Sequence, residues 1–515
     1  MSFAQVHTRS VVGLHAPEVM VEVHLSQGLP ALTIVGLPEA AVRESKDRVR
    51  SAIINSGFQF PNRRLTINLA PADLPKDGAR LDLPIAIGIL AASGQLDPEW
   101  VNDYEFIGEL ALNGDLRPVA GSLAVARAVK TTKIKQSEGQ KNASRNLIVP
   151  FTNANEASRV QGVIVLGAKS LQAVCNHLQV VHGGINFGKN TADLILQPFV
   201  PSIPQRQSAY KVDLADVKGQ HHARRALEIA AAGGHSILFK GPPGSGKTLM
   251  ASRLPTILPE LTDDEALEVA STYSVANTEY DFGTRPFREI HHTISAVALV
   301  GGGSRPRPGE ITLADKGVLF LDEMPEFDRK VLEVLRQPLE SKTITISRAN
   351  QQSTFPANFQ LIAAMNPCPC GYHGDTSNRC NCRPEQIQRY QDKLSGPLLD
   401  RIDLHISVPA IPMSDLQNAK AGEASAVVRE RVVSAHQRQI NRQGKANNDL
   451  TPAQLDKIAQ LGDTEKQLIA TAQSRLNLSA RGYHRVLRVA RTIADLSGSD
   501  NIETPHLTEA LSYRG

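Results

Sequence analysis

Short apolar runs alternate with helix-like stretches along the first third of the chain. The runs VMVEVHL, ALTIVGL, RLTINLA, NLIVP and GVIVLG have the length and the branched side chains of β-strands, whereas LPIAIGILAAS is helix-like. This alternation predicts a mixed α/β domain over residues 1–182. Within it, the polar stretch KTTKIKQSEGQKNASRN from Lys130 is expected to be an exposed loop.

The pattern changes twice after this domain. Residues 183–210 contain Gly, Asn, Gln and spaced prolines, which predicts a linker. A second α/β pattern covers residues 211–410, and residues 411–515 show helical periodicity without a convincing strand. We therefore expect an α/β multidomain protein with a helical carboxyl-terminal domain.

The segment ILFKGPPGSGKTLM carries the strongest chemical signal in the chain. A short apolar strand precedes the pattern G-x-x-x-x-G-K-[ST] and a helix-like stretch follows it, as a phosphate-binding loop requires. Lys247 can reach the β- and γ-phosphates of ATP, and the Thr248 hydroxyl can hold Mg²⁺. The helix N-terminus adds a favourable dipole. The residues expected to bind the nucleotide here are Gly241, Pro242, Pro243, Gly244, Ser245, Gly246, Lys247 and Thr248.

Two further apolar runs end in polar residues. The run GVLFLDE is continuous enough for a strand buried on both faces, and it ends at Asp322 and Glu323. After a phosphate loop, Asp322 is expected to hold Mg²⁺ and Glu323 to polarise the attacking water. The run FQLIAAMN ends at Asn366, which is expected to contact the γ-phosphate or the water; a simple turn before Pro367 is the alternative.

Composition limits the partners. A net charge of +4 and a pI near 8.7 are too mild for a basic coating protein, so nucleic acid would need positive charge concentrated in a groove or pore. No apolar run approaches the roughly 20 residues of a membrane helix. The start, MSFAQVHTRSVVG, does not resemble a signal peptide. We expect a cytoplasmic protein with no membrane partner.

The phosphate loop, the acidic strand end at Asp322 and Glu323, and the strand end at Asn366, in this order, resemble the nucleotide site of an AAA+ ATPase. The segment PFREIHHTISAVALVGGGSRPRPGEITLADKGVLFLDEMPEF from Pro286 is similar to the magnesium-chelatase-like branch, which carries an inserted loop in its second helix. The segments NPCPCGYHGD, CNC and KLSGPLLDRIDLHI narrow the resemblance further. Together they resemble the YifB/ComM family of competence-associated DNA helicases, over nearly the whole chain.

This resemblance implies further roles. Arg401 matches the arginine finger that an AAA+ ring inserts into a neighbouring subunit, an element worth about 10³–10⁵ in rate. Arg481 matches the second sensor arginine, although Arg485 and Arg488 share its helical face and the choice among the three stays open. The family implies a homohexamer on single-stranded and branched DNA, with recombination proteins as possible partners. The pore residues it implies for DNA contact are Arg305, Arg307, Lys342 and Arg348.

Four of the five cysteines are spaced C-x-C, nine residues, C-x-C. Four thiolates suit a closed structural zinc site, with an iron–sulfur cluster ranked second and His373 able to replace one ligand. We expect the metal to pin the loop between Asn366 and Arg401. The lone Cys175 is expected to be a small buried residue. The expected metal ligands are Cys368, Cys370, Cys380 and Cys382.

The first domain resembles a second family only in part. The segments PADLPKDGARLDLPIAIGIL and FIGELALNGDLRPVAG resemble the Lon protease (S5-type) α/β domain. That family cuts peptides with a Ser–Lys dyad, but here Ala79 follows the PKDG segment and Val125 stands where the lysine should be. We expect a Lon-like fold without proteolysis, reused for DNA binding or ring assembly.

The leading hypothesis is an ATP-driven, hexameric DNA motor that promotes branch migration during homologous recombination. In competence, this activity would extend the integration of incoming DNA. A magnesium-chelatase-type motor subunit, acting on a protein or porphyrin partner, shares the ATPase chemistry and is the alternative. An ATP-dependent protease is disfavoured because the Ser–Lys dyad is missing. An ATP-gated scaffold is disfavoured because the chain has both Glu323 and Arg401, and nucleotide binding alone needs neither.

Overall fold

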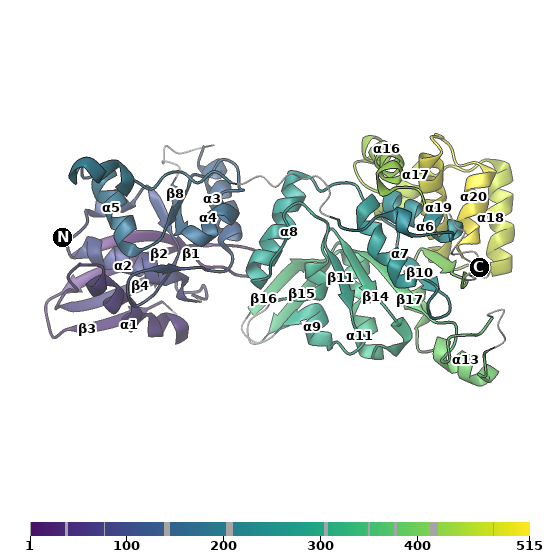
Figure 1. Ribbon diagram of the computed structural model, residues 1–515, viewed down its shortest axis with the longest axis horizontal. Coiled ribbons are helices and arrows are strands. Elements are labelled where there is room, and N and C mark those ends of the chain that lie inside the picture. Colours follow the sequence, from purple (N-terminus) through teal and green to yellow (C-terminus); the bar gives the residue numbers. More distant parts are fainter. Residues whose placement is uncertain are drawn as a thin grey trace. The chain divides into compact units, whose positions relative to one another are not determined.

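The chain forms two compact units (Figure 1). The computed structural model describes residues 2–36, 40–76, 78–137, 145–201, 210–302, 307–348, 351–374, 379–411, 421–476 and 478–514. Unit 1 comprises Met1–Gln205 and Leu267–Phe282, and unit 2 comprises Arg206–Ala266 and Gly283–Gly515. Among the described helices, none combines the length and the apolar character needed to cross a membrane.

Unit 1 is built on a seven-stranded mixed sheet, as the alternating pattern predicted. The strands, in spatial order, are β3 (Ala31–Val35), β4 (Arg64–Ala70), β2 (Glu18–Ser26), β1 (Phe3–Arg9), β5 (Tyr104–Phe106), β8 (Asn146–Pro150) and β9 (Val165–Ala168). The five runs predicted to be strands are all confirmed. Helix α2 (Asp82–Ala92) is buried along its whole length and packs on the sheet. The other helices are α1 (Ala40–Asn55), α3 (Ser122–Ser137), α4 (Phe151–Ala157) and α5 (Leu171–Val181), which contains the buried Cys175.

Two expectations about loops in unit 1 were wrong. Helix α3 continues to Ser137, so the polar stretch from Lys130 begins as helix; residues 138–144 lie outside the described residues. Its first half buries an apolar face, and the hydroxyls of Thr131 and Thr132 donate to carbonyls one turn earlier at 3.0 and 3.1 Å. The expected linker is also partly ordered, because η3 (Gly188–Leu194) is a 3₁₀ helix and the Phe199 N–H bonds to β9.

A segment from the second half of the chain belongs to unit 1. Residues Leu267–Phe282, which include most of α8 (Asp263–Ala276), pack against α3 and α4. Leu267 and Ala270 share a core with Val125 of α3. The guanidinium of Arg159 lies 4.4 Å above the ring of Phe282. The sequence pattern did not predict this exchange.

Unit 2 contains a five-stranded sheet in which every neighbouring pair is parallel. Such sheets are buried on both faces, which explains the continuous apolar runs. In spatial order the strands are β11 (Phe287–Ile290), β14 (Val318–Leu321), β17 (Gln360–Met365), β10 (Ile237–Lys240) and β18 (Leu404–Ser407). Because the strands are parallel and in register, their carboxyl ends meet at one edge of the sheet and their amino ends at the other. We call these the carboxyl edge and the amino edge.

Helices surround this sheet, and two hairpins extend from it. The helices are α6 (His221–Gly233), α7 (Lys247–Arg253), α9 (Ala296–Val300), α10 (Glu310–Leu313), α11 (Arg329–Val334), α12 (Arg336–Ser341), α13 (Pro384–Gln391) and α14 (Gly396–Leu399). The hairpins pair β12 (Gly301–Gly302) with β13 (Arg307–Pro308), and β15 (Thr343–Arg348) with β16 (Gln351–Pro356).

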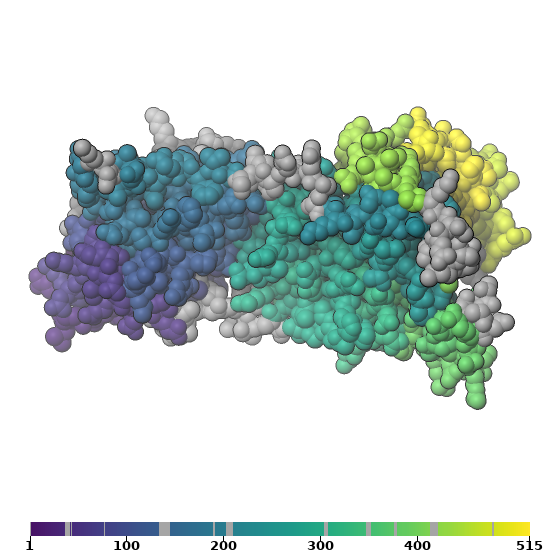
Figure 2. Space-filling model, in the orientation of Figure 1, coloured from purple at the N-terminus to yellow at the C-terminus, as the bar shows by residue number. Residues whose placement is uncertain are grey.

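The carboxyl-terminal region is helical in its described part, as predicted. Its helices share one hydrophobic core with α6, β10 and β18, and Figure 2 shows them in light green to yellow beside the teal part of unit 2. The helices are α16 (Ser425–Gln443), α17 (Pro452–Ile458), α18 (Asp463–Leu476), α19 (Ala480–Leu496) and α20 (Thr504–Ser512).

Candidate nucleotide site and arginine edge

The phosphate loop lies at the carboxyl edge, between β10 and α7. Its first residue must be glycine, because a Cβ at Gly241 would lie 2.1 Å from the Val408 carbonyl oxygen. The next turns place Gly244 and Gly246 at φ of 75° and 88°, in the left-handed region that favours glycine. The loop therefore has the backbone needed to turn its N–H groups toward a phosphate.

Lys247 is held inside the loop. Its ammonium group donates to the carbonyls of Gly241 and Pro242 at 2.8 and 2.9 Å, and to Asn366 Oδ1 at 3.2 Å. Burial lowers the pKa of Lys247, while the nearby Asp322 and Glu323 act in the opposite direction. The end of β17 therefore brings Asn366 into the same site, as the strand pattern predicted.

The two acidic residues after β14 lie beside the loop. Thr248 donates to Asp322 Oδ2 at 2.8 Å, so the two side chains expected to hold Mg²⁺ are already together. Glu323 adopts a left-handed backbone (φ 51°), and its N–H donates to Asp322 Oδ1 at 2.9 Å. The Glu323 side chain is 54% exposed. Oxygen and hydroxyl ligands in this arrangement fit Mg²⁺.

Sequence reasoning missed His292 at this edge. Its Nδ1 atom lies 3.7 Å from Glu323 Oε2, and its ring lies edge-on to Phe327. His292 follows β11, which pairs in parallel with β14, so both strand ends reach the carboxyl edge. The short run FREI before the histidine pair was the available signal.

Arg401 lies at the opposite, amino edge of the sheet. Its carbonyl accepts from the Ser236 hydroxyl at 3.1 Å, and Ser236 directly precedes β10. The four residues of β10, about 13 Å of strand, therefore separate it from the phosphate loop of its own subunit. The guanidinium donates to Glu340 and to the Pro397 carbonyl, both at 2.5 Å, and is only 5% exposed.

The three arginines of α19 considered for the second sensor have different surroundings. Arg485 forms an ion pair with the buried Asp403 and also donates to the Arg401 carbonyl at 2.8 Å. Arg488 donates to the Leu450 carbonyl. Arg481 is 63% exposed, and its Nη2 lies 3.7 Å from Glu340 Oε1, beside Arg401. Arg481 is the most exposed of the three, and it too lies at the amino edge.

The residues expected to contact DNA are less completely described. Arg305 lies outside the described residues, and so does the side chain of Arg348 in β15. Arg307 is exposed on β13. Lys342 precedes β15 and lies 3.4 Å from Asp449, with 35% of its side chain exposed.

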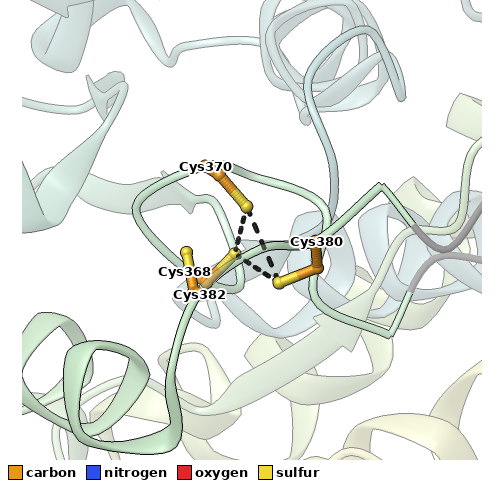
Figure 3. Close-up of side chains that lie close together, drawn as sticks. All are labelled: Cys368, Cys370, Cys380 and Cys382. Carbon is orange, nitrogen blue, oxygen red and sulfur yellow. Dashed lines mark hydrogen bonds between the residues drawn. The ribbon is translucent and has the colours of Figure 1, made fainter.

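The four cysteines gather on the loop between β17 and α13 (Figure 3). The Sγ atoms of Cys368, Cys370 and Cys380 lie 3.3–3.8 Å apart, and all four Sγ atoms, including that of Cys382, fall within 4.8 Å of one another. Tetrahedral zinc with bonds of 2.3 Å separates sulfurs by about 3.8 Å, so the cluster fits that ion. Hydrogen bonds from the Tyr372 N–H and from Cys368 lower the pKa of Cys370 to about 6.

This cysteine loop touches the phosphate loop. Gly371 has φ 87°, and a Cβ there would lie 2.6 Å from Pro243 Cδ. Pro367 accepts from Gln391 at 3.2 Å, which ties the loop to α13. The cluster therefore sits directly against the candidate nucleotide site, a contact that the cysteine spacing did not predict.

Similar proteins were found over the full length of the chain. It is 50% identical to the competence protein ComM of Haemophilus influenzae, over 100% of this chain and 98% of that protein. It is 48% identical to the YifB protein of Escherichia coli, over 100% of this chain and 97% of that protein. The chain belongs to the ComM/YifB family. The predicted resemblance is thereby confirmed.

The chain also matches families that are named for magnesium chelatase. Three families match it in succession: "Subunit ChlI of Mg-chelatase" over residues 21–153, "Magnesium chelatase, subunit ChlI" over residues 213–416, and "Magnesium chelatase, subunit ChlI C-terminal" over residues 422–514. The magnesium-chelatase 38 kDa subunit of Rhodobacter capsulatus is 24% identical over 58% of this chain and 86% of that subunit. These matches identify an AAA+ ATPase of the magnesium-chelatase type, whose family binds ATP and Mg²⁺.

Proposed function

We propose that this protein is a ring-forming, ATP-dependent DNA motor that promotes branch migration during homologous recombination. The observation that carries the proposal is the placement of the polar side chains in unit 2. The nucleotide-binding groups lie at the carboxyl edge, while Arg401 and Arg481 lie at the amino edge of the same sheet. A subunit with this layout offers its arginines to a neighbour and receives the neighbour's arginines in return. Head-to-tail contacts of this kind close into rings, and we propose a homohexamer.

Each polar side chain described at the carboxyl edge has a proposed role in ATP hydrolysis. Lys247 binds the β- and γ-phosphates, and Thr248 with Asp322 would hold Mg²⁺, which offsets charge on the phosphates when it is bound. The exposed Glu323 orients and polarises the attacking water, and His292 restrains that carboxylate. Asn366, which accepts a hydrogen bond from Lys247, contacts the γ-phosphate or the attacking water. Four thiolates of the cysteine loop would hold zinc and keep that loop against Pro243.

DNA as the substrate is supported by similarity to a competence protein over essentially the whole of both chains. We propose single-stranded and branched DNA as partners, with recombination proteins as further ones. Positive charge in the pore would bind the phosphate backbone without sequence preference. The residues proposed to supply it are Arg305, Arg307, Lys342 and Arg348.

A magnesium-chelatase-type motor remains the second candidate, because the three matching families all carry that description. The first domain does not separate the two functions, since residues 21–153 match such a family as well. The degree of similarity favours the DNA motor: 50% identity over the whole chain, against 24% over 58% of it for the chelatase subunit.

The test is ATP hydrolysis measured without DNA, with single-stranded DNA and with a four-way junction. We compare the wild type with Glu323→Gln and with Glu430→Gln, which changes an exposed carboxylate on α16. We expect DNA to stimulate the wild type and Glu430→Gln, and we expect Glu323→Gln to lose about 10²–10³-fold in kcat while still binding ATP.

The stimulated enzyme is then given a labelled junction, and strand exchange is followed on a native gel. Movement of the branch point that requires ATP supports the proposal. Hydrolysis that is the same with and without every DNA would overturn it and favour the chelatase-type motor.

A further inference from the structure

Glu340 stands between the two arginines of the amino edge. It is the last carboxylate of α12, and its Oε1 atom lies 2.5 Å from Arg401 Nη2 and 3.7 Å from Arg481 Nη2. Arg401 comes from the segment before β18, and Arg481 from the first turn of α19. We propose that Glu340 is a positioning residue that holds these two arginines as a pair for the nucleotide of the neighbouring subunit. The inference rests on the proposed ring.

A carboxylate is needed here for an electrostatic reason. Two guanidinium groups repel each other, and a shared anion offsets that repulsion while fixing the direction of their N–H groups. Glu340 is 51% exposed, so it lies at the surface where a neighbour would dock. The Arg401 side chain is 5% exposed and is held in place by its neighbours, whereas the Arg481 side chain is 63% exposed and extends into solvent.

The backbone of Arg401 is held independently of Glu340. Its carbonyl accepts from Arg485 Nη1 at 2.8 Å and from the Ser236 hydroxyl at 3.1 Å. Loss of the Glu340 charge therefore leaves the guanidinium with the Pro397 carbonyl as its acceptor and leaves the surrounding fold in place.

A partner that supplies an anion at this edge would give the two guanidinium groups a further acceptor. The γ-phosphate of a neighbouring subunit is such an anion, and arginine is well suited to it. Misplacing a catalytic group by about 1 Å can cost about 10²-fold in rate. The effect of Glu340 should therefore appear in kcat, because it acts after the nucleotide is bound.

The first experiment compares Glu340→Gln with Glu340→Asp and with Glu423→Gln. The control pair, Glu423 with Arg431, is also an exposed Glu–Arg ion pair in unit 2, with both side chains 42% exposed. We expect Glu340→Gln to lower kcat about 10- to 100-fold while the KM for ATP, the Tm and the mass of the assembly stay unchanged. Glu340→Asp, which keeps the charge, should recover part of the loss, and Glu423→Gln should match the wild type.

The second experiment tests whether Glu340 acts on a neighbour. Glu340→Gln and Glu323→Gln subunits are co-expressed and purified together. Glu323→Gln subunits keep the arginine pair, and Glu340→Gln subunits keep the water-activating carboxylate. Because ring contacts run head to tail, random mixing joins the two intact halves at about a quarter of the interfaces, and hydrolysis should recover accordingly.

Three outcomes separate the inference from the proposed function. Wild-type kcat in Glu340→Gln, or no recovery in the mixed assemblies while the wild type remains DNA-stimulated, overturns the role of Glu340 alone. A loss in Glu340→Gln that comes with a lower Tm and is not recovered by Glu340→Asp also overturns it, because the residue would then be structural. A wild type that ignores DNA overturns the DNA motor, and recovery in the mixed assemblies would still support the arginine pair.

Discussion

The two edges of the unit 2 sheet are built in opposite ways. At the carboxyl edge, Thr248, Asp322 and Glu323 come from two short motifs 74 residues apart, and their side chains are partly or largely exposed. At the amino edge, Arg401 and Asp403 are 6% and 1% exposed, and segments far apart in the sequence hold them. The carboxyl edge is nearly complete in one subunit, whereas the amino edge presents groups that have no substrate of their own. In the proposed ring, one site is divided between two copies of this sheet, and that is what the comparison teaches.

The largest expected effect separates the two edges directly. Arg401→Ala should lower kcat by about 10³-fold or more, because it removes the charge that stabilises the transition state. Its affinity for a fluorescent ATP analogue should stay close to that of the wild type, since the phosphate loop lies at the other edge. Lys247→Ala should instead abolish binding of the analogue. Weak binding by Arg401→Ala would mean that the arginine contacts the nucleotide of its own subunit.

The next effect concerns the stability of the amino edge. Asp403 pairs with Arg485 and accepts from the Ser236 N–H at 2.9 Å. Asp403→Asn leaves Arg485 without its partner anion, which should lower the free energy of unfolding by about 3–5 kcal/mol. Urea denaturation measures this loss. Asp500→Asn, at a side chain 99% exposed, is the matched control and should change little.

The same variant has a defined pH dependence. Burial alone would raise the pKa of Asp403. The charge of Arg485, together with the neighbouring His235 and the hydrogen bonds that Asp403 accepts from Ser236, holds that pKa well below its usual value. A depressed folded-state pKa stabilises the fold above the unfolded pKa, about 3.9, and this contribution disappears as the pH falls toward the folded value. The stability difference between wild type and Asp403→Asn should not shrink between pH 8 and pH 5, because protonation of the neighbouring His235 would favour the carboxylate, and it should shrink below pH 4. A difference that already shrinks between pH 8 and pH 5 would contradict this account.

A smaller effect tests the contact between the cysteine loop and the carboxyl edge. Gly371→Ala places a Cβ 2.6 Å from Pro243 Cδ, so the affinity for ATP should fall by about tenfold, equivalent to about 1.4 kcal/mol. Gly374→Ala is the matched control, because it has a similar φ of 79° and no atom within 4 Å. Removal of zinc with a chelator should shift ATP affinity in the same direction. Metal analysis that finds no zinc in gently purified protein would contradict the proposed metal.

The smallest expected effect lies outside both edges. Lys342→Gln should weaken DNA binding a few-fold and reduce the salt dependence of that binding by about one counterion. Fluorescence anisotropy at several salt concentrations measures both. Lys466→Gln, which changes an exposed lysine beside Asp463, should leave DNA binding unchanged. Equal effects of the two variants would remove Lys342 from the proposed pore.

The sequence predicted the elements of this protein better than their partners. Five of the seven sheet strands of unit 1, α2 and the strand ends at Asp322 and Asn366 follow from local apolar patterns, because each pattern repeats with the period of its element. The end of the first domain was predicted less well. Helix α3 runs further than its polar composition suggests, because the apolar half anchors the rest. Residues Leu267–Phe282 lie in unit 1 because Leu267 and Ala270 complete its core, which no local pattern records.

By itself, the sequence determined the phosphate loop, the acidic strand end and the cysteine set. Each is a short motif whose spacing alone brings its atoms together, and the family followed from the same motifs. Only the tertiary structure decided that Glu340 joins Arg401 to Arg481, that Gly371 contacts Pro243, and that the arginines lie at the edge opposite the phosphate loop. These contacts join segments tens of residues apart, and their geometry depends on strand order and on the packing of α19.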